Sequence, residues 1–137
     1  MKRLLILFFL IVSVSSFSYG YDDDIQGKWW KHPKIVKELE LTNDQVNRIE
    51  AVFSSYRPQM IDLDSKLKEK EGKLRDTHRN PNSTREEISR LNDEVEGIRE
   101  NMRRVRLDMF LQIRDLLTPQ QRTKLEEIRS KYGKTHH

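Results

Sequence analysis

Arginine and methionine carry most of the binding chemistry in this sequence. They gather with a phenylalanine in two stretches, around residues 57–60 and 99–110, and the candidates are Arg57, Met60, Arg99, Met102, Arg103, Arg106 and Phe110. Methionine adapts its shape to different partners, and arginine attracts acidic or aromatic groups. This mixture is typical of a surface that binds many proteins weakly. Methionines in a helix seam and arginines on a solvated helix face are the alternative interpretation.

Groups used in enzyme catalysis do not form a recognisable site in the sequence. The chain has no cysteine and no glycine-rich phosphate loop, and many of its carboxylates stand four residues before a lysine, as Asp62 does before Lys66. Pairs at this spacing stabilise the surface of a helix rather than a reaction centre. The sequence therefore predicts a protein that is not an enzyme.

Metal binding is only weakly indicated, and we expect no cofactor. The histidines are His32, His78, His136 and His137. No two of them share a helix face at the spacing of three or four residues that would organise a zinc site. A site built from the tails, with His136 and His137 and the acidic run 22–24, is the one alternative that would bring zinc to the protein.

Two long helices are predicted to position these side chains. Apolar residues recur at alternating spacings of three and four from residue 46 to 74 and again from 88 to 116, with Gln112 as an interruption. This is the spacing of a heptad seam. It predicts helices over residues 43–76 and 84–116.

The segment between the two long helices is predicted to be a short loop, residues 76–84. It contains the turn-forming run N-P-N, and Ser83 with Glu86 predicts a capping box at the start of the second helix. Long helices joined by so short a loop lie antiparallel. The resulting hairpin would place Met60 close to Met102.

The motif L-T-x-x-Q occurs twice, at the positions where the long helices are expected to meet short ones. The copies are Leu41, Thr42 and Gln45, and Leu117, Thr118 and Gln121. A threonine N-cap accepts a hydrogen bond from the backbone N–H three residues on, and a glutamine at that position accepts one from the cap's own N–H. Each copy is therefore a capping box. The two boxes predict similar corners next to short helices over residues 33–40 and 119–132.

The stretch 109–117 is apolar on most helix faces. Either the short helices pack against it, or part of it forms a dimer contact or a binding patch. A lone hairpin buries a single seam, so we also expect a homodimer.

The first 20 residues have the pattern of a cleaved secretory signal peptide. Lys2 and Arg3 precede an apolar run, and the small residues Ser18 and Gly20 stand at the expected cleavage positions. The apolar run is shorter than the roughly 20 residues that a membrane-spanning helix needs, so no membrane segment is expected after cleavage. Without Lys2 and Arg3 the chain has 24 basic and 22 acidic residues, a near balance that argues against a nucleic-acid partner.

The exported part is expected to divide into three segments. These are a flexible N-terminal arm over residues 21–32, one helical domain over 33–132 and a tail over 133–137. Charged residues make up 35% of the chain, which leaves little apolar material for a thick core and favours a thin, all-α architecture.

The signal peptide and the two L-T-x-x-Q boxes flanking a long charged hairpin together resemble the Spy/CpxP family of periplasmic proteins. The resemblance covers about residues 34–132. It implies an all-helical, cradle-shaped antiparallel dimer that resides in the periplasm. Such a protein holds unfolded or aggregation-prone clients without ATP under envelope stress, and its L-T-x-x-Q residues have a structural role.

The same resemblance implies two alternative functions. One is repression of an envelope-stress sensor kinase, whose periplasmic domain would then be the partner. The other is that of a zinc-responsive metal-resistance protein. Suppression of the aggregation of unrelated clients, binding of a single partner and uptake of zinc distinguish the three functions.

Overall fold

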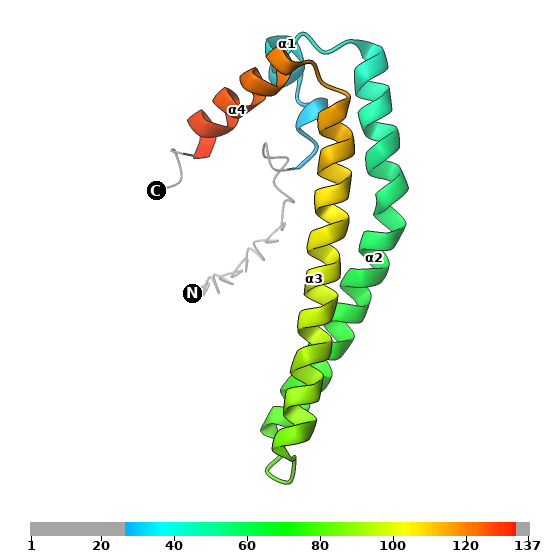
Figure 1. The fold of residues 1–137 in the computed structure, drawn as a ribbon, viewed down its shortest axis with the longest axis vertical. Helices are drawn as coiled ribbons and strands as arrows, with labels where there is room; N and C mark the ends of the chain where they lie inside the picture. Colours follow the sequence, from blue (N-terminus) through cyan, green and yellow to red (C-terminus); the bar gives the residue numbers. More distant parts are fainter. Residues whose placement is uncertain (1–26, 134–137) are drawn as a thin grey trace, which may run out of the picture.

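The computed structural model describes residues 27–133 as a set of helices (Figure 1). They are the 3-10 helix η1 (Trp29–Lys31) and the α-helices α1 (Pro33–Glu38), α2 (Asn43–Arg79), α3 (Arg85–Asp115) and α4 (Pro119–Gly133). No strand occurs in this range. The expected signal peptide, the beginning of the expected arm, and His136 and His137 lie outside the described residues.

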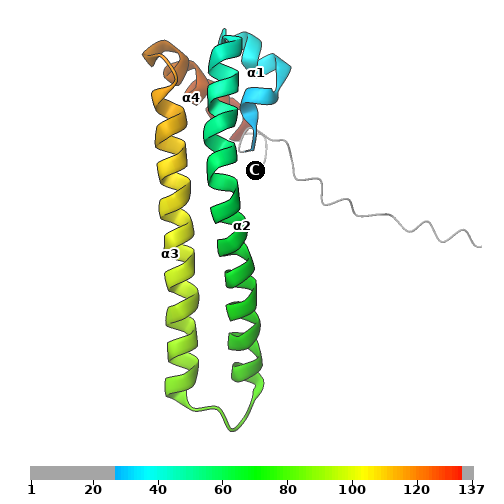
Figure 2. The same ribbon diagram turned by 90° about the vertical axis from the view of Figure 1, so that its right-hand side faces the viewer.

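The two long helices, α2 and α3, form the predicted antiparallel hairpin (Figures 1 and 2). α2 ends three residues later than the heptad pattern indicated, because residues 77–79 are polar and carry no seam signal. Its C-cap, Asn80, has an extended backbone with φ −81° and ψ 116°. Because Asn80 precedes Pro81, the helical conformation is disfavoured there, and the helix stops.

The capping box predicted from Ser83 and Glu86 is wrong by one residue. The N-cap of α3 is Thr84, whose Oγ1 accepts from the N–H of Glu87 at 3.2 Å, while the N–H of Thr84 donates to Glu87 Oε2 at 2.9 Å. The N–H of Ser83 instead donates to the carbonyl of Asn80 at 3.1 Å and closes the turn. The sequence contains two overlapping capping boxes, Ser83 with Glu86 and Thr84 with Glu87. The turn uses Ser83, so Thr84 becomes the N-cap.

Most of the core lies at the end of the hairpin where the short helices gather. This end cluster joins every helix and contains Trp29, Trp30, Ile35, Leu39, Ile49, Ile113, Leu117, Leu125 and Ile128. A smaller cluster further along the hairpin contains Leu63, Met102 and Val105. The short helices therefore cover part of the apolar stretch 109–117, while Phe110 and Leu111 stay exposed.

The N-terminal segment is held against the hairpin from residue 27 onward, although the sequence predicts a flexible arm over 21–32. Trp29 and Trp30 are only 4% and 3% exposed, and the Trp30 ring packs on that of Phe53 with their centroids 5.3 Å apart. Two tryptophans in the end cluster bury enough apolar surface to order this part of the segment.

The interruption of the seam at Gln112 has a polar cause. Tyr56 of α2 donates a hydrogen bond to the carboxylate of Asp108 on α3, and Gln112 Nε2 donates to the Tyr56 hydroxyl. The bond to Asp108 raises the pKa of Tyr56. Gln112 thus satisfies the polar tip of a seam tyrosine, and its neighbour Ile113 takes the buried position.

The turn from α1 into α2 is a Schellman motif with an unfavourable residue in it. The N–H of Leu41 donates to the carbonyl of Val36 at 3.0 Å, and the N–H of Glu40 donates to that of Lys37 at 3.1 Å. Glu40 has φ 50°, in the left-handed region that glycine normally occupies in this motif. A side chain with a Cβ is strained there.

Replacing Glu40 with glycine is expected to stabilise the fold by about 1 kcal/mol, because the left-handed conformation costs roughly that much for a residue with a Cβ. Thermal unfolding followed by circular dichroism measures the effect. Glu40→Ala is the matched control, since it removes the same carboxylate but keeps the strain. A melting temperature that rises equally in both variants would show that the charge, not the backbone, is responsible.

Candidate functional site

The two L-T-x-x-Q copies meet in space, and their glutamines are hydrogen-bonded to each other. Gln45 Nε2 donates to Gln121 Oε1 at 2.7 Å, and Gln121 Nε2 donates to Gln45 Oε1 at 3.0 Å. The pair joins residues 76 positions apart in the sequence. It locks the corner between α1 and α2 onto the corner between α3 and α4.

Each copy also forms the capping box that the sequence predicts. The N–H of Gln45 donates to Thr42 Oγ1 at 3.1 Å, and the N–H of Thr42 donates to Gln45 Oε1 at 3.1 Å. In the second copy the corresponding distances between Gln121 and Thr118 are 3.2 and 3.0 Å. Each glutamine Oε1 therefore accepts two hydrogen bonds, one from its own cap and one from the other motif.

The remaining amide hydrogens reach the backbone of the opposite corner. Gln45 Nε2 also donates to the carbonyl of Leu116, and Gln121 Nε2 to that of Leu39, both at 3.1 Å. Glutamate would serve a capping box equally well, but a carboxylate has no hydrogen to donate. The cross-corner contacts thus explain why both motifs end in glutamine.

Gln45→Glu and Gln121→Glu are each expected to destabilise the protein by about 1–3 kcal/mol, the cost of leaving partly buried acceptors without their donor. Chemical unfolding by urea measures this loss. The capping box of Thr84 and Glu87 supplies the matched control: Glu87→Gln makes the reverse exchange in a box that bonds to no second corner, and should change stability little. Equal, small effects at all three positions would mean that the amide pair contributes nothing beyond capping.

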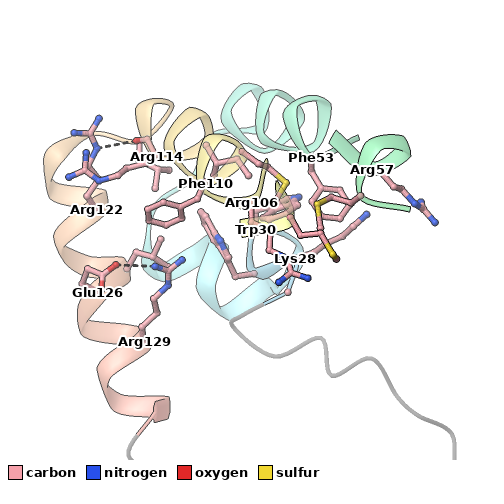
Figure 3. A pocket seen from close by; sticks show the side chains of 18 of the residues that line it. Lys28, Trp30, Phe53, Arg57, Arg106, Phe110, Arg114, Arg122, Glu126 and Arg129 are labelled. Atoms are coloured by element: carbon pink, nitrogen blue, oxygen red, sulfur yellow. Dashed lines mark hydrogen bonds and ion pairs between the residues drawn. The ribbon is translucent and has the colours of Figure 1, made fainter. Parts of the chain in front are cut away.

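The locked corner holds α4 and η1 beside the hairpin, and a groove of about 980 Å³ opens between them (Figure 3). Its apolar lining comes from separate elements and includes Trp30, Phe53, Met60, Met102, Met109 and Phe110. Phe110 is 38% exposed and Ile61, also in the lining, is 59% exposed. Large apolar side chains are therefore available to a bound molecule.

The groove is also basic. Six basic side chains line it, namely Lys28, Arg57, Arg106, Arg114, Arg122 and Arg129, against the two acidic ones of Asp64 and Glu126. Arg57 stands at one end of the groove in Figure 3, and Arg122 and Arg129 stand on α4 at the other. The lining favours ligands that carry negative charge.

The basic side chains differ in how far the protein itself satisfies them. Arg129 pairs with Glu126 at 3.0 Å and lies over the ring of Phe110, 5.5 Å from its centroid, while Arg122 donates to the carbonyl of Arg114 at 3.0 Å. The side chains of Arg57, Arg106 and Arg114 have no carboxylate partner among residues 27–133. As far as residues 27–133 are concerned, these three side chains remain available to a ligand.

The structure divides the binding residues predicted from the sequence into two sets. Arg57, Met60, Met102, Arg106 and Phe110 all line the groove. Arg99 and Arg103 do not.

The two arginines outside the groove are engaged in ion pairs on the hairpin surface. Arg99 bonds to Glu71 at 2.7 Å and to Glu96 at 2.6 Å, and Arg103 bonds to Glu100 at 2.6 Å. The pairing of Glu71 with Arg99 of α3 replaces the contact with Arg75 that helical spacing suggests. Both arginines therefore match the alternative of a solvated helix face.

Sequence reasoning missed the groove residues contributed by the short elements. Arg114, Arg122 and Arg129 lie at or beyond the end of the heptad pattern, and Lys28 precedes it. Only the folding of α4 and η1 back toward the hairpin brings them to the same place. No periodicity in the sequence signals this arrangement.

Glu50 of α2 anchors the η1 segment that forms one wall of the groove. Its carboxylate accepts from Trp30 Nε1 at 2.8 Å and from Lys28 Nζ at 3.0 Å, and pairs with Lys31 Nζ at 3.3 Å. Burial alone would raise the pKa of Glu50. The three donors outweigh burial, so the pKa lies below its ordinary value of 4.5.

Acid is expected to loosen the η1 wall. A carboxyl group whose pKa is lowered by folding stabilises the structure above its unfolded pKa and loses this contribution as the pH falls through the folded value. The pH window thus lies below 4.5. Trp29 and Trp30 are the two tryptophans of the chain, so a red shift of tryptophan fluorescence reports their exposure.

Glu50→Gln tests the assignment of this transition, because the amide still accepts from Trp30 but no longer titrates. The fluorescence step below pH 4.5 should be absent from this variant. An unchanged step would place the titrating group elsewhere.

Two classes of site do not appear in the described part of the chain. Between residues 27 and 133, no group of three or more histidine and carboxylate side chains is placed to hold a metal ion. None of the helices there is long and apolar enough to cross a membrane.

Comparison with known proteins identifies the family. The family model of the LTXXQ motif family proteins matches residues 28–129, about three quarters of the chain. The chain therefore belongs to the LTXXQ motif family, the family of Spy/CpxP-like periplasmic proteins, which is non-enzymatic. The curated proteins and the solved structures gave no match.

Proposed function

We propose that this protein is a periplasmic holding chaperone that binds unfolded or aggregation-prone proteins without ATP. Family membership supports a chaperone-like function. The signal-peptide pattern of residues 1–20 supports export to the periplasm. The observation that carries the proposal is the groove, which combines accessible apolar side chains with arginines that have no carboxylate partner among residues 27–133.

The chemistry of the groove suits clients of many sequences. Met60 and Met109 are half-buried and present flexible thioether side chains that repack around different apolar groups, whereas Met102 is only 7% exposed and belongs to the smaller core cluster. Arg57, Arg106 and Arg114 add attraction for acidic or aromatic residues that needs no fixed geometry. A client can therefore be recognised by composition rather than by sequence.

The same chemistry keeps binding weak enough to be reversible. An exposed cation–π contact contributes about 0.5–1 kcal/mol, and exposed ion pairs contribute about 0.2–1 kcal/mol. Several such contacts together hold a client, while each single contact breaks at a small cost in free energy. Release then follows from the client's own folding and requires no nucleotide.

A homodimer is part of the proposal. Leu107 and Leu111 stand one helical turn apart on α3, are 56% and 45% exposed and do not line the groove. An apolar pair on the hairpin outside the groove is suited to contact with a second copy of the chain. Such a dimer would leave the groove of each copy open.

The predicted arginines fall into two sets, one in the groove and one on the hairpin surface. The proposal can therefore be tested by comparing variants of the same chain. Arg57→Gln with Arg106→Gln removes two positive charges from the groove, and Arg99→Gln with Arg103→Gln removes two from the hairpin surface. The groove variant should suppress the aggregation of an acidic client, reduced α-lactalbumin, several-fold less well than the unaltered protein. The surface variant should retain most of the activity, because its arginines are already satisfied by carboxylates.

Light scattering measures suppression, and circular dichroism verifies that both variants remain helical. The difference between the variants should shrink as salt is raised, since exposed charges are screened within about 8 Å at physiological ionic strength. Equal losses in the two variants would remove the groove as the site of holding. Absence of suppression by the unaltered protein would overturn the chaperone function itself.

A further inference from the structure

We propose that the groove binds a second kind of ligand, a free single-chain amphiphile with an anionic head, of which a fatty acid carboxylate is the simplest. The groove volume of about 980 Å³ falls within the roughly 300–1,000 Å³ typical of sites for small molecules. Such sites combine an apolar lining with a few polar groups that fix the orientation of the ligand. The groove has both components, and binding of an amphiphile does not depend on the proposed holding of proteins.

Two arginines form a site for the anionic head. Tyr56 of α2 donates a hydrogen bond to Asp108 of α3, which fixes the register of the two helices. Arg57 is the next residue of α2, and Arg106 lies two residues before Asp108. The two arginines therefore lie at nearly the same level on neighbouring helices, and both line the groove without a carboxylate partner among residues 27–133. A carboxylate placed between them can accept hydrogen bonds from both guanidinium groups.

The site for the apolar tail lies one helical turn nearer the two L-T-x-x-Q corners. Phe53 lies four residues before Arg57 on α2, and Phe110 lies four residues after Arg106 on α3. Because the helices are antiparallel, both rings lie on the same side of the arginine pair, toward the end where η1 and α4 gather (Figure 1). The Trp30 ring packs on that of Phe53, and in Figure 3 these rings and Phe110 lie between Arg57 and α4. An apolar chain that runs this way from the head site therefore meets aromatic side chains.

The opposite direction suits an apolar tail less well. Toward the hairpin tip, the lining ends at Ile61 and Asp64 of α2 and at Met102 of α3. Ile61 is 59% exposed, Met102 is only 7% exposed, and Asp64 places a carboxylate beside any chain that passes it. The tail should therefore run toward the corners from a head bound at Arg57 and Arg106.

Head and tail contribute separately to the affinity, so each can be varied in the ligand. Shortening laurate to decanoate removes two methylene groups from the apolar lining and should weaken binding about tenfold. Dodecyltrimethylammonium has the same chain as laurate with a cationic head, which the basic lining repels. It should bind about tenfold more weakly than laurate.

The methionines provide the readout of binding. Apart from Met1, the chain contains Met60, Met102 and Met109, and all three line the groove. Carbon-13 labelling of their methyl groups therefore gives NMR signals that report on the groove. The shifts of these signals, followed as laurate is added below its micelle concentration, give the dissociation constant.

The head site is tested with two matched double variants. Arg57→Gln with Arg106→Gln should weaken laurate binding about fivefold, since exposed ion pairs contribute little each. Arg99→Gln with Arg103→Gln removes the same charge from the hairpin surface, where both arginines are paired with carboxylates. This control should bind laurate as the unaltered protein does.

The orientation of the ligand is tested with stearic acid that carries a nitroxide near its methyl end. Met109 lies three residues after Arg106, toward the corners, whereas Met60 lies three residues after Arg57, toward the tip. The nitroxide should therefore reduce the methyl signal of Met109 more than that of Met60. A greater loss at Met60 would place the head at the α4 end of the groove and overturn the arginine pair as its site.

The remaining outcomes decide whether the ligand class is correct. Methyl signals that do not respond to laurate would overturn the inference, and equal binding of laurate and dodecyltrimethylammonium would overturn recognition of an anionic head. Binding to phosphatidylglycerol vesicles without a response to free laurate would assign the arginines to a membrane surface instead. Suppression of client aggregation is a separate measurement. A protein that holds reduced α-lactalbumin but does not bind laurate would contradict this inference and leave the proposed function intact, and the reverse result would do the opposite.

Discussion

The reciprocal pair of hydrogen bonds between the side-chain amides of Gln45 and Gln121 is the contact on which the rest of the arrangement depends. Without these hydrogen bonds, each L-T-x-x-Q copy would do no more than cap the start of its own helix. With them, two corners from opposite ends of the folded segment become one joint, and every hydrogen-bonding position of both amides is used. The groove exists because this joint returns α4 toward the hairpin beside η1.

The hairpin and its corners could be predicted from the sequence because their signals are local. The heptad spacing marks α2 and α3, and the capping boxes mark where α2 and α4 begin. The contact between the two corners has no local signal, because a capping box does not indicate which other corner it will bind. The shift from Ser83 to Thr84 has the same origin, since two overlapping boxes fit the local rule and the turn hydrogen bond selects one.

The groove was predictable only in its hairpin half. Arg57, Met60, Met102, Arg106 and Phe110 follow from folding the long helices together, and they do line it. Composition alone could not separate them from the ion-paired Arg99 and Arg103. Arg99 reaches Glu71 across the seam, whereas Arg103 pairs with Glu100 of its own helix. The half supplied by η1 and α4 depends on two tertiary features, the glutamine pair and the packing of the tryptophans in the end cluster.

Because most of the core lies at one end of the hairpin, local stability decreases from that end toward the tip. The end cluster ties together all five helices, whereas no side chain of residues 64–94 is buried. The hairpin tip is therefore held by half-exposed seam residues and surface ion pairs, which open at little cost. The joint and the groove therefore lie at the rigid end of the molecule, and the hairpin tip is its flexible end. Thermal motion of the tip can therefore change the outline of the hairpin while the joint and the groove keep their geometry.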